Sequence, residues 1–204
     1  MKCYIKDYPR PQFVRNDWEN LNGTWDFGFD DENAGEKEKW YQEFKGDKKI
    51  NVPFTYETKL SGIQDETRHD FIWYHRTINV DGVKLENNRY ILHFEGSDFI
   101  TKVWVNGAYA GSHRGGYARC SFDVTNLVHD GENELTVKVE DSFDTQQPRG
   151  KQRWINENFG CWYVQTTGIW KTVWSEYVPK ISLASVKMTP DLQNAALKLE
   201  YEVA

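Results

Sequence analysis

The segment Asn133-Glu134-Leu135-Thr136-Val137-Lys138-Val139-Glu140 alternates apolar and polar residues over its whole length. Successive side chains of a β-strand point to opposite faces, so Leu135, Val137 and Val139 share one face and the polar residues share the other. This pattern predicts a strand with one buried face. The same alternation recurs at residues 71–80 and 89–95, which predicts further strands of the same kind.

Turn signals separate the alternating segments. Val103-Trp104-Val105-Asn106-Gly107-Ala108-Tyr109 places Asn-Gly between two strand-like runs. Because Asn and Gly both tolerate positive φ, we expect a type I′ hairpin here. Residues 123–127 predict a strand that runs into a short helical turn, and residues 168–178 predict one deeply buried strand.

Many short strands with turns at this spacing indicate an all-β sandwich or jelly roll. A parallel α/β fold would need amphipathic helices between its strands, and the sequence offers none of useful length. After residue 180, alternation resumes at 181–188 and 196–203, with a turn expected at Thr189-Pro190-Asp191. We therefore expect one domain over residues 1–180 and the start of a second β domain at 181–204.

The composition excludes several classes of protein. The chain has 204 residues, 39% hydrophobic and 27% charged, as is usual for a globular domain. A net charge of −6 argues against a nucleic-acid partner. No apolar run approaches the ~20 residues that a membrane-spanning helix needs. We expect neither nucleic acid nor membrane as a partner.

The cysteines and histidines show no ordered spacing. Cys3, Cys120 and Cys161 form neither a disulfide framework nor a CxxC pair, and the polar N-terminus lacks the apolar core of a signal peptide. These features predict a reducing, cytoplasmic location. Since no metal-ligand spacing, phosphate loop or dinucleotide fingerprint is present, we expect no metal and no cofactor. The charged run at residues 36–39 is interpreted as a solvated loop or helix start.

Two segments, 53–70 and 141–163, interrupt the strand pattern. The second is rich in cations and aromatic rings, which predicts an ordered surface loop rather than a linker. Its candidate binding residues are Arg149, Lys151, Arg153, Trp154, Trp162 and Tyr163. Guanidinium and ammonium groups donate hydrogen bonds to hydroxyl groups or to carboxylates of a ligand or a neighbouring domain. The alternative is that this loop only packs against another domain.

A second candidate site is the turn-like segment His113-Arg114-Gly115-Gly116-Tyr117. Its glycines permit positive φ or a close approach of the backbone, so His113 and Arg114 are candidate binding residues. The alternative is a structural turn at the rim of the sandwich. Nine Trp residues likewise have two readings, as core filling or as platforms that stack on sugar rings.

A series of motifs resembles one known family. In chain order they are Leu21-Asn22-Gly23-Thr24-Trp25-Asp26-Phe27, Val52-Pro53-Phe54, Leu60-Ser61-Gly62-Ile63, Trp73-Tyr74-His75-Arg76, Leu92-His93-Phe94-Glu95-Gly96, Val103-Trp104-Val105-Asn106-Gly107, Gly111-Ser112-His113-Arg114-Gly115-Gly116-Tyr117, Phe122-Asp123-Val124-Thr125, Pro148-Arg149-Gly150-Lys151-Gln152 and Thr166-Thr167-Gly168-Ile169-Trp170. This series resembles the N-terminal sugar-binding domain of glycoside hydrolase family 2, which includes β-galactosidases, β-glucuronidases and β-mannosidases.

The resemblance implies a galactose-binding-like jelly-roll β-sandwich over residues 1–180. In the family an immunoglobulin-like sandwich and a catalytic (β/α)8 barrel follow, and 181–204 would be the first hairpin of that sandwich. Two barrel carboxylates, typically ~5–5.5 Å apart, cleave the glycosidic bond with retention. The sequence contains neither barrel motif, so we assign no catalytic residue. The family's pocket-facing Asp would fall near Trp162, and no Asp is there.

Three functions follow from these observations. The favoured one is a non-catalytic domain that supports the barrel of a β-galactosidase-like parent and shapes its sugar pocket. On this reading the partners are the carbohydrate substrate and the barrel of the same parent, and the 204-residue chain alone is inactive. The alternatives are a stand-alone carbohydrate-binding module and an assembly element that forms a homo-oligomer through residues 2–15.

Overall fold

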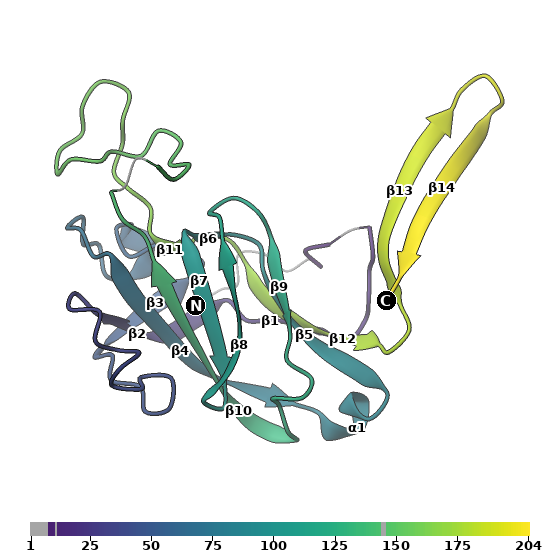
Figure 1. The fold of residues 1–204 in the computed structure, drawn as a ribbon, viewed down its shortest axis with the longest axis horizontal. Helices are drawn as coiled ribbons and strands as arrows, with labels where there is room; N and C mark the ends of the chain where they lie inside the picture. The colour runs from purple at the N-terminus through teal and green to yellow at the C-terminus, as the bar shows by residue number, and fades with distance from the viewer. Residues whose placement is uncertain (1–7, 11, 144–145) are drawn as a thin grey trace.

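The computed structural model describes residues 8–10, 12–143 and 146–204, and shows an all-β architecture (Figure 1). The strands are β1 (Trp18–Asn20), β2 (Gly23–Phe29), β3 (Lys48–Val52), β4 (Phe71–Val80), β5 (Asn88–Phe94), β6 (Ser97–Asp98), β7 (Ile100–Val105), β8 (Ala108–Arg114), β9 (Cys120–Asp123), β10 (Gly131–Glu140), β11 (Gly168–Ile169), β12 (Val173–Pro179), β13 (Leu183–Asp191) and β14 (Ala196–Val203). The helical segments are one short helix, α1 (Gly82–Leu85), and one 3-10 turn at Lys59–Ser61.

Two antiparallel sheets form a sandwich. The larger has the order β3-β2-β4-β10-β7-β8 and the smaller has the order β1-β12-β5-β9. β10 pairs with β4 along its full length, from Gly131 opposite Val80 to Glu140 opposite Phe71. The short strands β6 and β11 pair at one end of the sandwich. This arrangement confirms the predicted all-β sandwich.

The core lies between the two sheets and follows the predicted alternation. The residues expected to point inward are all buried: Ile72, Tyr74, Ile78, Val80, Tyr90, Leu92, Phe94, Leu135, Val137 and Val139. Aromatic rings fill much of the space, and Phe27 meets Tyr74 edge to face at 5.1 Å. Burying an aromatic side chain of this size removes about 150–250 Å² from water, so such rings dominate the stability of the sandwich.

The outer face of the larger sheet differs from the prediction. Thr136 and Lys138 were expected in solvent, but each is 2% exposed. The cause is the loop 30–47, which lies over this face: Glu36 accepts a hydrogen bond from the Lys138 ammonium at 2.8 Å and from Lys102 at 2.7 Å. The reading of residues 36–39 as simply solvated is therefore wrong for Glu36, although the next three residues are exposed.

Two turn predictions have different outcomes. Asn106 and Gly107 have φ values of 51° and 76°, which confirms the type I′ hairpin between β7 and β8. The single strand predicted over 168–178 is wrong, because β11 and β12 belong to different sheets. Trp170 and Lys171 both donate their backbone N–H groups to the carbonyl of Gly96, and the chain crosses from one sheet to the other there.

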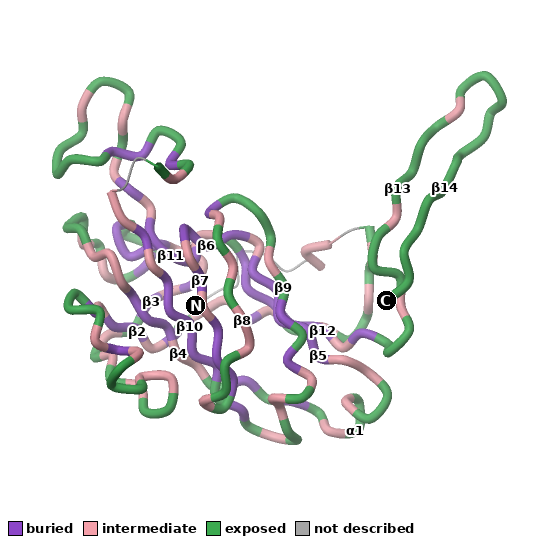
Figure 2. The backbone as a smooth tube through the Cα atoms, in the orientation of Figure 1, coloured by how far each residue is buried: buried purple, intermediate pink, exposed green. Residues whose placement is uncertain are grey.

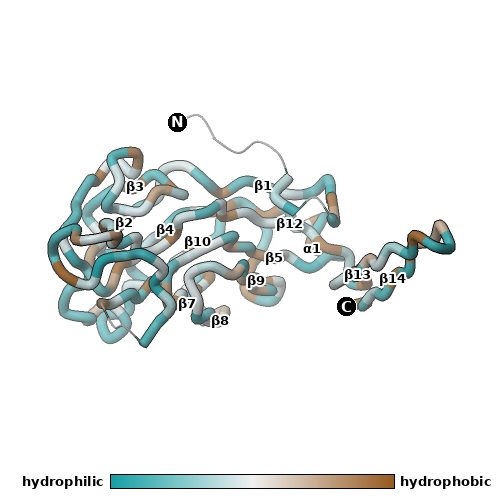
Figure 3. The backbone as a smooth tube through the Cα atoms, turned by 90° about the horizontal axis from the view of Figure 1, so that it is seen from above, coloured by the Kyte–Doolittle hydropathy of each residue, from teal (hydrophilic) through white to brown (hydrophobic). Residues whose placement is uncertain are grey.

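The hairpin of β13 and β14 extends away from the sandwich in both views (Figures 1 and 3). β13 continues through Asp191, so the expected turn at 189–191 is wrong and the chain reverses at residues 192–195. The Asp191 carboxylate accepts from the backbone N–H of Asn194 at 3.1 Å and closes this turn. Nearly every residue of the hairpin is exposed (Figure 2). The boundary between two domains at residue 180 stays a prediction.

Within the described ranges, no helix has the length and apolar character needed to cross a bilayer. The same residues contain no group of three or more His, Cys, Asp or Glu arranged to hold a metal ion. Cys120 is half-buried, Cys161 is exposed, and both are free thiols. Cys3 lies outside the described residues. So do residues 2–7 and 11 of the segment 2–15 that was expected to mediate assembly.

Candidate functional site

The candidate loop connects β10 to β11 and projects beyond the end of the larger sheet (Figure 1). Its described residues form isolated bridges, Gln152 with Tyr163 and Phe159 with Trp162. Two backbone hydrogen bonds close it across its neck: Arg153 N–H donates to the Tyr163 carbonyl at 2.6 Å, and Tyr163 N–H donates to Lys151 at 2.9 Å. The described part of the loop is thus a closed, hydrogen-bonded structure, as predicted for this segment.

Arg149 lies at the base of the loop and is 7% exposed. Its guanidinium donates to the carbonyl of Ser142 and to that of Arg153, the latter at 3.2 Å. It also forms an ion pair with Asp141 at 3.5 Å. These contacts join Arg149 to the start of the loop at residues 141–142 and to Arg153, so the structure places Arg149 in a supporting position.

Arg153 is also buried, with 5% exposure. Its guanidinium donates to Gln165 Oε1 at 2.9 Å, to Asn158 at 3.2 Å and to the carbonyl of Glu66 at 2.9 Å. Glu66 belongs to the other irregular segment, 53–70, so Arg153 joins the two segments that interrupt the strand pattern. An open cavity of about 590 Å³ lies at this junction, lined by Glu66, Thr67, Arg68, Arg153 and Asn156.

Of the remaining candidates, Lys151 and Tyr163 lie at the neck, and Trp154 and Trp162 lie beyond it. Trp154 packs edge to face against Phe159 and Trp162, with ring centroids 5.1 and 4.6 Å away. Trp154 is 36% exposed and Tyr163 is 60% exposed, and Lys151 is exposed as well. Figure 2 shows the change from a buried base to an exposed tip. The exposed surface of the loop therefore presents aromatic rings and an ammonium group to a neighbouring molecule or domain.

The second candidate segment lies beside the base of the loop. Asp98 of β6 accepts a hydrogen bond from Gln152 at 2.8 Å, and a Cβ added to Gly116 would lie 2.2 Å from its carboxylate. Gly116 is thus required by the close approach of Asp98. Arg114 is exposed, with its guanidinium 5.0 Å from the centre of the Phe99 ring. His113 Nε2 is buried and has no hydrogen-bond partner within the described residues.

Buried carboxyl groups support this region, and sequence reasoning did not select them. Burial, together with the charge of Asp141, raises the pKa of Asp98 to about 6. Burial also raises the pKa of Asp141, and that of Glu57 to about 7. Glu57 accepts from the backbone N–H of Thr167 at 3.0 Å, at the entry to β11. Their surroundings come from strands distant in sequence, so no local motif identifies them.

Taken together, the described residues of the loop offer hydrogen-bond donors and aromatic faces, and no nucleophile and base are paired among them. Such a surface can bind or orient a ligand, or pack against a neighbouring domain. Residues 18–174 match the family model described as glycosyl hydrolases family 2, sugar binding domain.

The chain belongs to glycosyl hydrolase family 2. A putative β-glucuronidase of Formosa agariphila is 32% identical over 143 residues, which are 69% of this chain and 16% of that protein. A β-galactosidase of Thermoanaerobacter pseudethanolicus is 26% identical over 191 residues, which are 90% of this chain and 23% of that protein. The family 2 chain therefore spans less than a quarter of the length of these two relatives.

Solved structures agree with this assignment. A β-glucuronidase from an uncultured Clostridium species superposes with a TM-score of 0.73 and 25% identity, over 93% of this chain and 35% of that one. The apo β-glucuronidase of Ruminococcus gnavus superposes with a TM-score of 0.75 over 93% of this chain and 34% of that one, at 19% identity. The second likeness supports the fold alone.

Proposed function

We propose that the chain is a non-catalytic domain of a larger retaining β-glycosidase, in which it supports a (β/α)8 barrel and shapes the sugar pocket. The observation that carries the proposal is the projecting loop between β10 and β11. Buried Arg149 and Arg153 hold its neck, while the side chains of Trp154 and Tyr163 are exposed on its surface. A rigid element of this kind adds contacts at the edge of a neighbouring site without moving during binding.

The substrate class follows from the relatives, which are named β-glucuronidase and β-galactosidase. The parent would act on β-linked sugars of these types, with the two carboxylates of the barrel as acid/base and nucleophile. Within this chain, Lys151, Trp154, Trp162 and Tyr163 are the proposed pocket-facing residues. Arg149 and Arg153 act as positioning residues because their guanidinium groups already donate hydrogen bonds to other atoms of the loop.

His113 and Arg114 belong to the same proposal in a lesser role, since their segment adjoins the loop through Asp98. The proposed setting is the cytoplasm, supported by the widely spaced, free thiols of Cys120 and Cys161. A homo-oligomeric parent is compatible with the proposal and is tested by sedimentation of the full-length protein.

The experiment compares the purified 204-residue chain with the full-length protein on para-nitrophenyl β-galactoside and β-glucuronide. We expect turnover of at least one substrate by the full-length protein and none by the chain. Turnover by the chain alone would overturn its non-catalytic assignment. An inactive full-length protein, shown by its melting transition to be folded, would overturn the proposed parent activity.

A further inference from the structure

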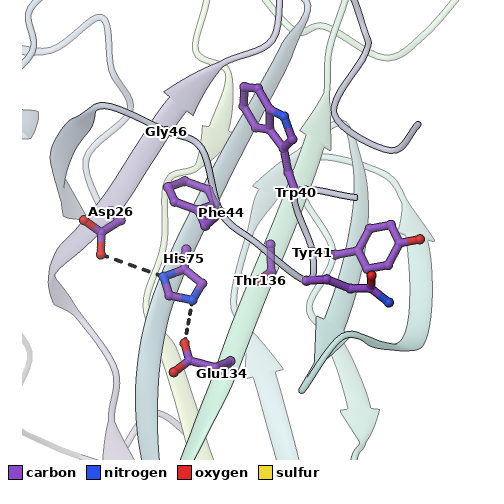
Figure 4. A pocket seen from close by; sticks show the side chains of 9 residues that line it. Asp26, Trp40, Tyr41, Phe44, Gly46, His75, Glu134 and Thr136 are labelled. Atoms are coloured by element: carbon purple, nitrogen blue, oxygen red, sulfur yellow. Dashed lines mark ion pairs between the residues drawn. The ribbon is translucent and has the colours of Figure 1, made fainter. Parts of the chain in front are cut away.

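A cavity of about 530 Å³ lies on the outer face of the larger sheet, under the loop 30–47 (Figure 4). A row of directly paired residues crosses this face: Asp26 of β2, His75 of β4, Thr136 of β10, Trp104 of β7 and Tyr109 of β8. The first three line the cavity. Its size falls within the ~300–1,000 Å³ of small-molecule sites.

Aromatic rings form the walls of this cavity. Phe44 stacks on His75 with ring centroids 5.1 Å apart, and Tyr41 stacks on Trp104 at 5.3 Å. Trp40 is the third ring in the lining. All three aromatic residues from the loop are only half-buried. Their free faces are available to a ligand, and aromatic faces attract C–H groups that carry a small positive charge.

The floor and rim are polar. Thr136 lines the cavity, and its hydroxyl has no hydrogen-bond partner among residues 8–10, 12–143 and 146–204, although its oxygen is not a fully buried atom. The exposed Gln42 amide lies at the rim, likewise without a partner in the described part of the chain. Both groups are therefore free to form hydrogen bonds with water or with a ligand.

The charges at the rim are already compensated within the protein. His75 Nε2 lies 2.6 Å from Glu134, and its Nδ1 lies 3.8 Å from Asp26 (Figure 4). Asp26 also pairs with Lys49. A charged ligand would have to compete with these pairs, whereas a neutral ligand rich in hydroxyl groups would not. The remaining donors and acceptors suit hydroxyls.

The loop that carries the rings is held in place before any ligand arrives. The Asp30 carboxylate accepts from the backbone of Ala34 at 2.7 Å and from that of Gly35 at 3.0 Å, and also from Trp73 Nε1 at 2.9 Å. The ion pairs of Glu36 with Lys138 and Lys102 fix the next turn. A preformed site loses less entropy when it binds a ligand.

The hollow surface continues past Tyr41. A second cavity of about 420 Å³ lies on its other side, between Glu36, Lys102, Trp104 and Tyr109. Because Tyr41 lines both cavities, they adjoin each other at its ring, and the two together are called the groove below. The groove therefore offers two adjacent positions, each with an aromatic wall and polar groups.

We propose that this groove binds a neutral oligosaccharide through two successive pyranose rings, one on each side of Tyr41. A pyranose has an apolar C–H face for the aromatic walls and an edge of hydroxyls for Thr136 and Gln42. The groove lies across the middle of β10, whereas the candidate loop begins after its last residue, Glu140. The proposal therefore goes beyond the function proposed for that loop and does not depend on it.

The test is calorimetric titration of the 204-residue chain with lactose and cellobiose, and with glucuronic acid as the charged comparison. We expect both disaccharides to bind with millimolar or better affinity and glucuronic acid to bind more weakly. Gln42→Ala and Thr136→Val should each weaken disaccharide binding roughly tenfold, about the loss expected for a well-placed contact. The matched control Glu43→Ala changes a neighbouring exposed residue outside the cavity lining, and should bind like the wild type.

Trp154→Ala changes the candidate loop instead of the groove, and so reports whether the measured binding takes place on that loop. Absence of binding by either disaccharide at high millimolar concentration would overturn the proposal. So would binding that is lost in Trp154→Ala and kept in Gln42→Ala. Should Thr136→Val fail to fold, Gln42→Ala still decides the question, because the exposed Gln42 side chain has no described contact that folding requires.

Discussion

Replacing Arg153 by Met tests whether one buried guanidinium holds the loop between β10 and β11. The substitution keeps much of the apolar stem and removes hydrogen bonds to Gln165, Asn158 and the Glu66 carbonyl. Asn158 is exposed and can turn to water. The Glu66 carbonyl keeps a bond from Gln165 Nε2 at 3.2 Å. Only Gln165 Oε1, in a side chain 2% exposed, loses its partner without replacement.

Arg153→Met should therefore lower the free energy of unfolding by about 1–3 kcal/mol, the cost of leaving one buried acceptor without a donor. The loss should not reach the sum of three charge-assisted hydrogen bonds. Urea unfolding gives the free energy, and limited proteolysis reports opening of the loop, which should be cut faster in the variant. Lys151→Met is the matched control, since its exposed ammonium has no described bond, and it should change stability by less than ~0.5 kcal/mol. Equal stability of Arg153→Met and wild type would refute the reasoning.

Two further predictions concern the buried carboxyl groups of Glu57 and Glu176. Burial raises the pKa of Glu57 to about 7 from 4.5, so the folded state binds the extra proton and stability falls as pH rises between these values. Glu57→Gln should remove this loss of folding free energy, which amounts to about 3 kcal/mol at pH 8. Thermal melts of wild type and variant across pH measure it, and a variant with the same pH dependence as the wild type would contradict the prediction. Glu176 is 1% exposed and accepts hydrogen bonds from Tyr8 at 2.6 Å and Arg15 at 2.9 Å, and it pairs with His93 at 3.0 Å. Glu176→Gln should cost about 1–3 kcal/mol and expose the segment before β1 to proteases, and protection equal to wild type would count against this anchoring role.

The sequence predicts the inner face of the sandwich well because alternation is a local property. Leu135, Val137 and Val139 sit where their spacing places them. It fails on the opposite face of the same strand, where Lys138 is buried beneath Glu36, a residue 102 positions away. No residue near Lys138 in the sequence indicates that the loop 30–47 covers this face of the strand. The run 168–178 fails for a related reason, since a change of sheet depends on what pairs with each half.

The candidate site shows the same division. The loop was found from its composition, because cations and aromatic rings are rare in a flexible linker. Sequence alone did not separate its buried members, Arg149 and Arg153, from the exposed Trp154 and Tyr163. That separation depends on which side chains fold back onto Asp141 and Gln165 within the loop, and on Glu66, which reaches it from the segment 53–70. The roles of the eight candidate residues as sugar contacts stay a prediction.

The most direct test of the central claim is steady-state kinetics of the full-length protein carrying Trp154→Ala on an aryl β-glycoside. If the loop shapes the sugar pocket, kcat/KM should fall about tenfold or more, mainly through KM, with the melting temperature unchanged. Trp154→Phe should recover part of the loss, and Gln42→Ala, on the loop 30–47, should match the wild type. A wild-type kcat/KM for Trp154→Ala, with or without a lower melting temperature, would contradict the claim and leave the loop a packing element.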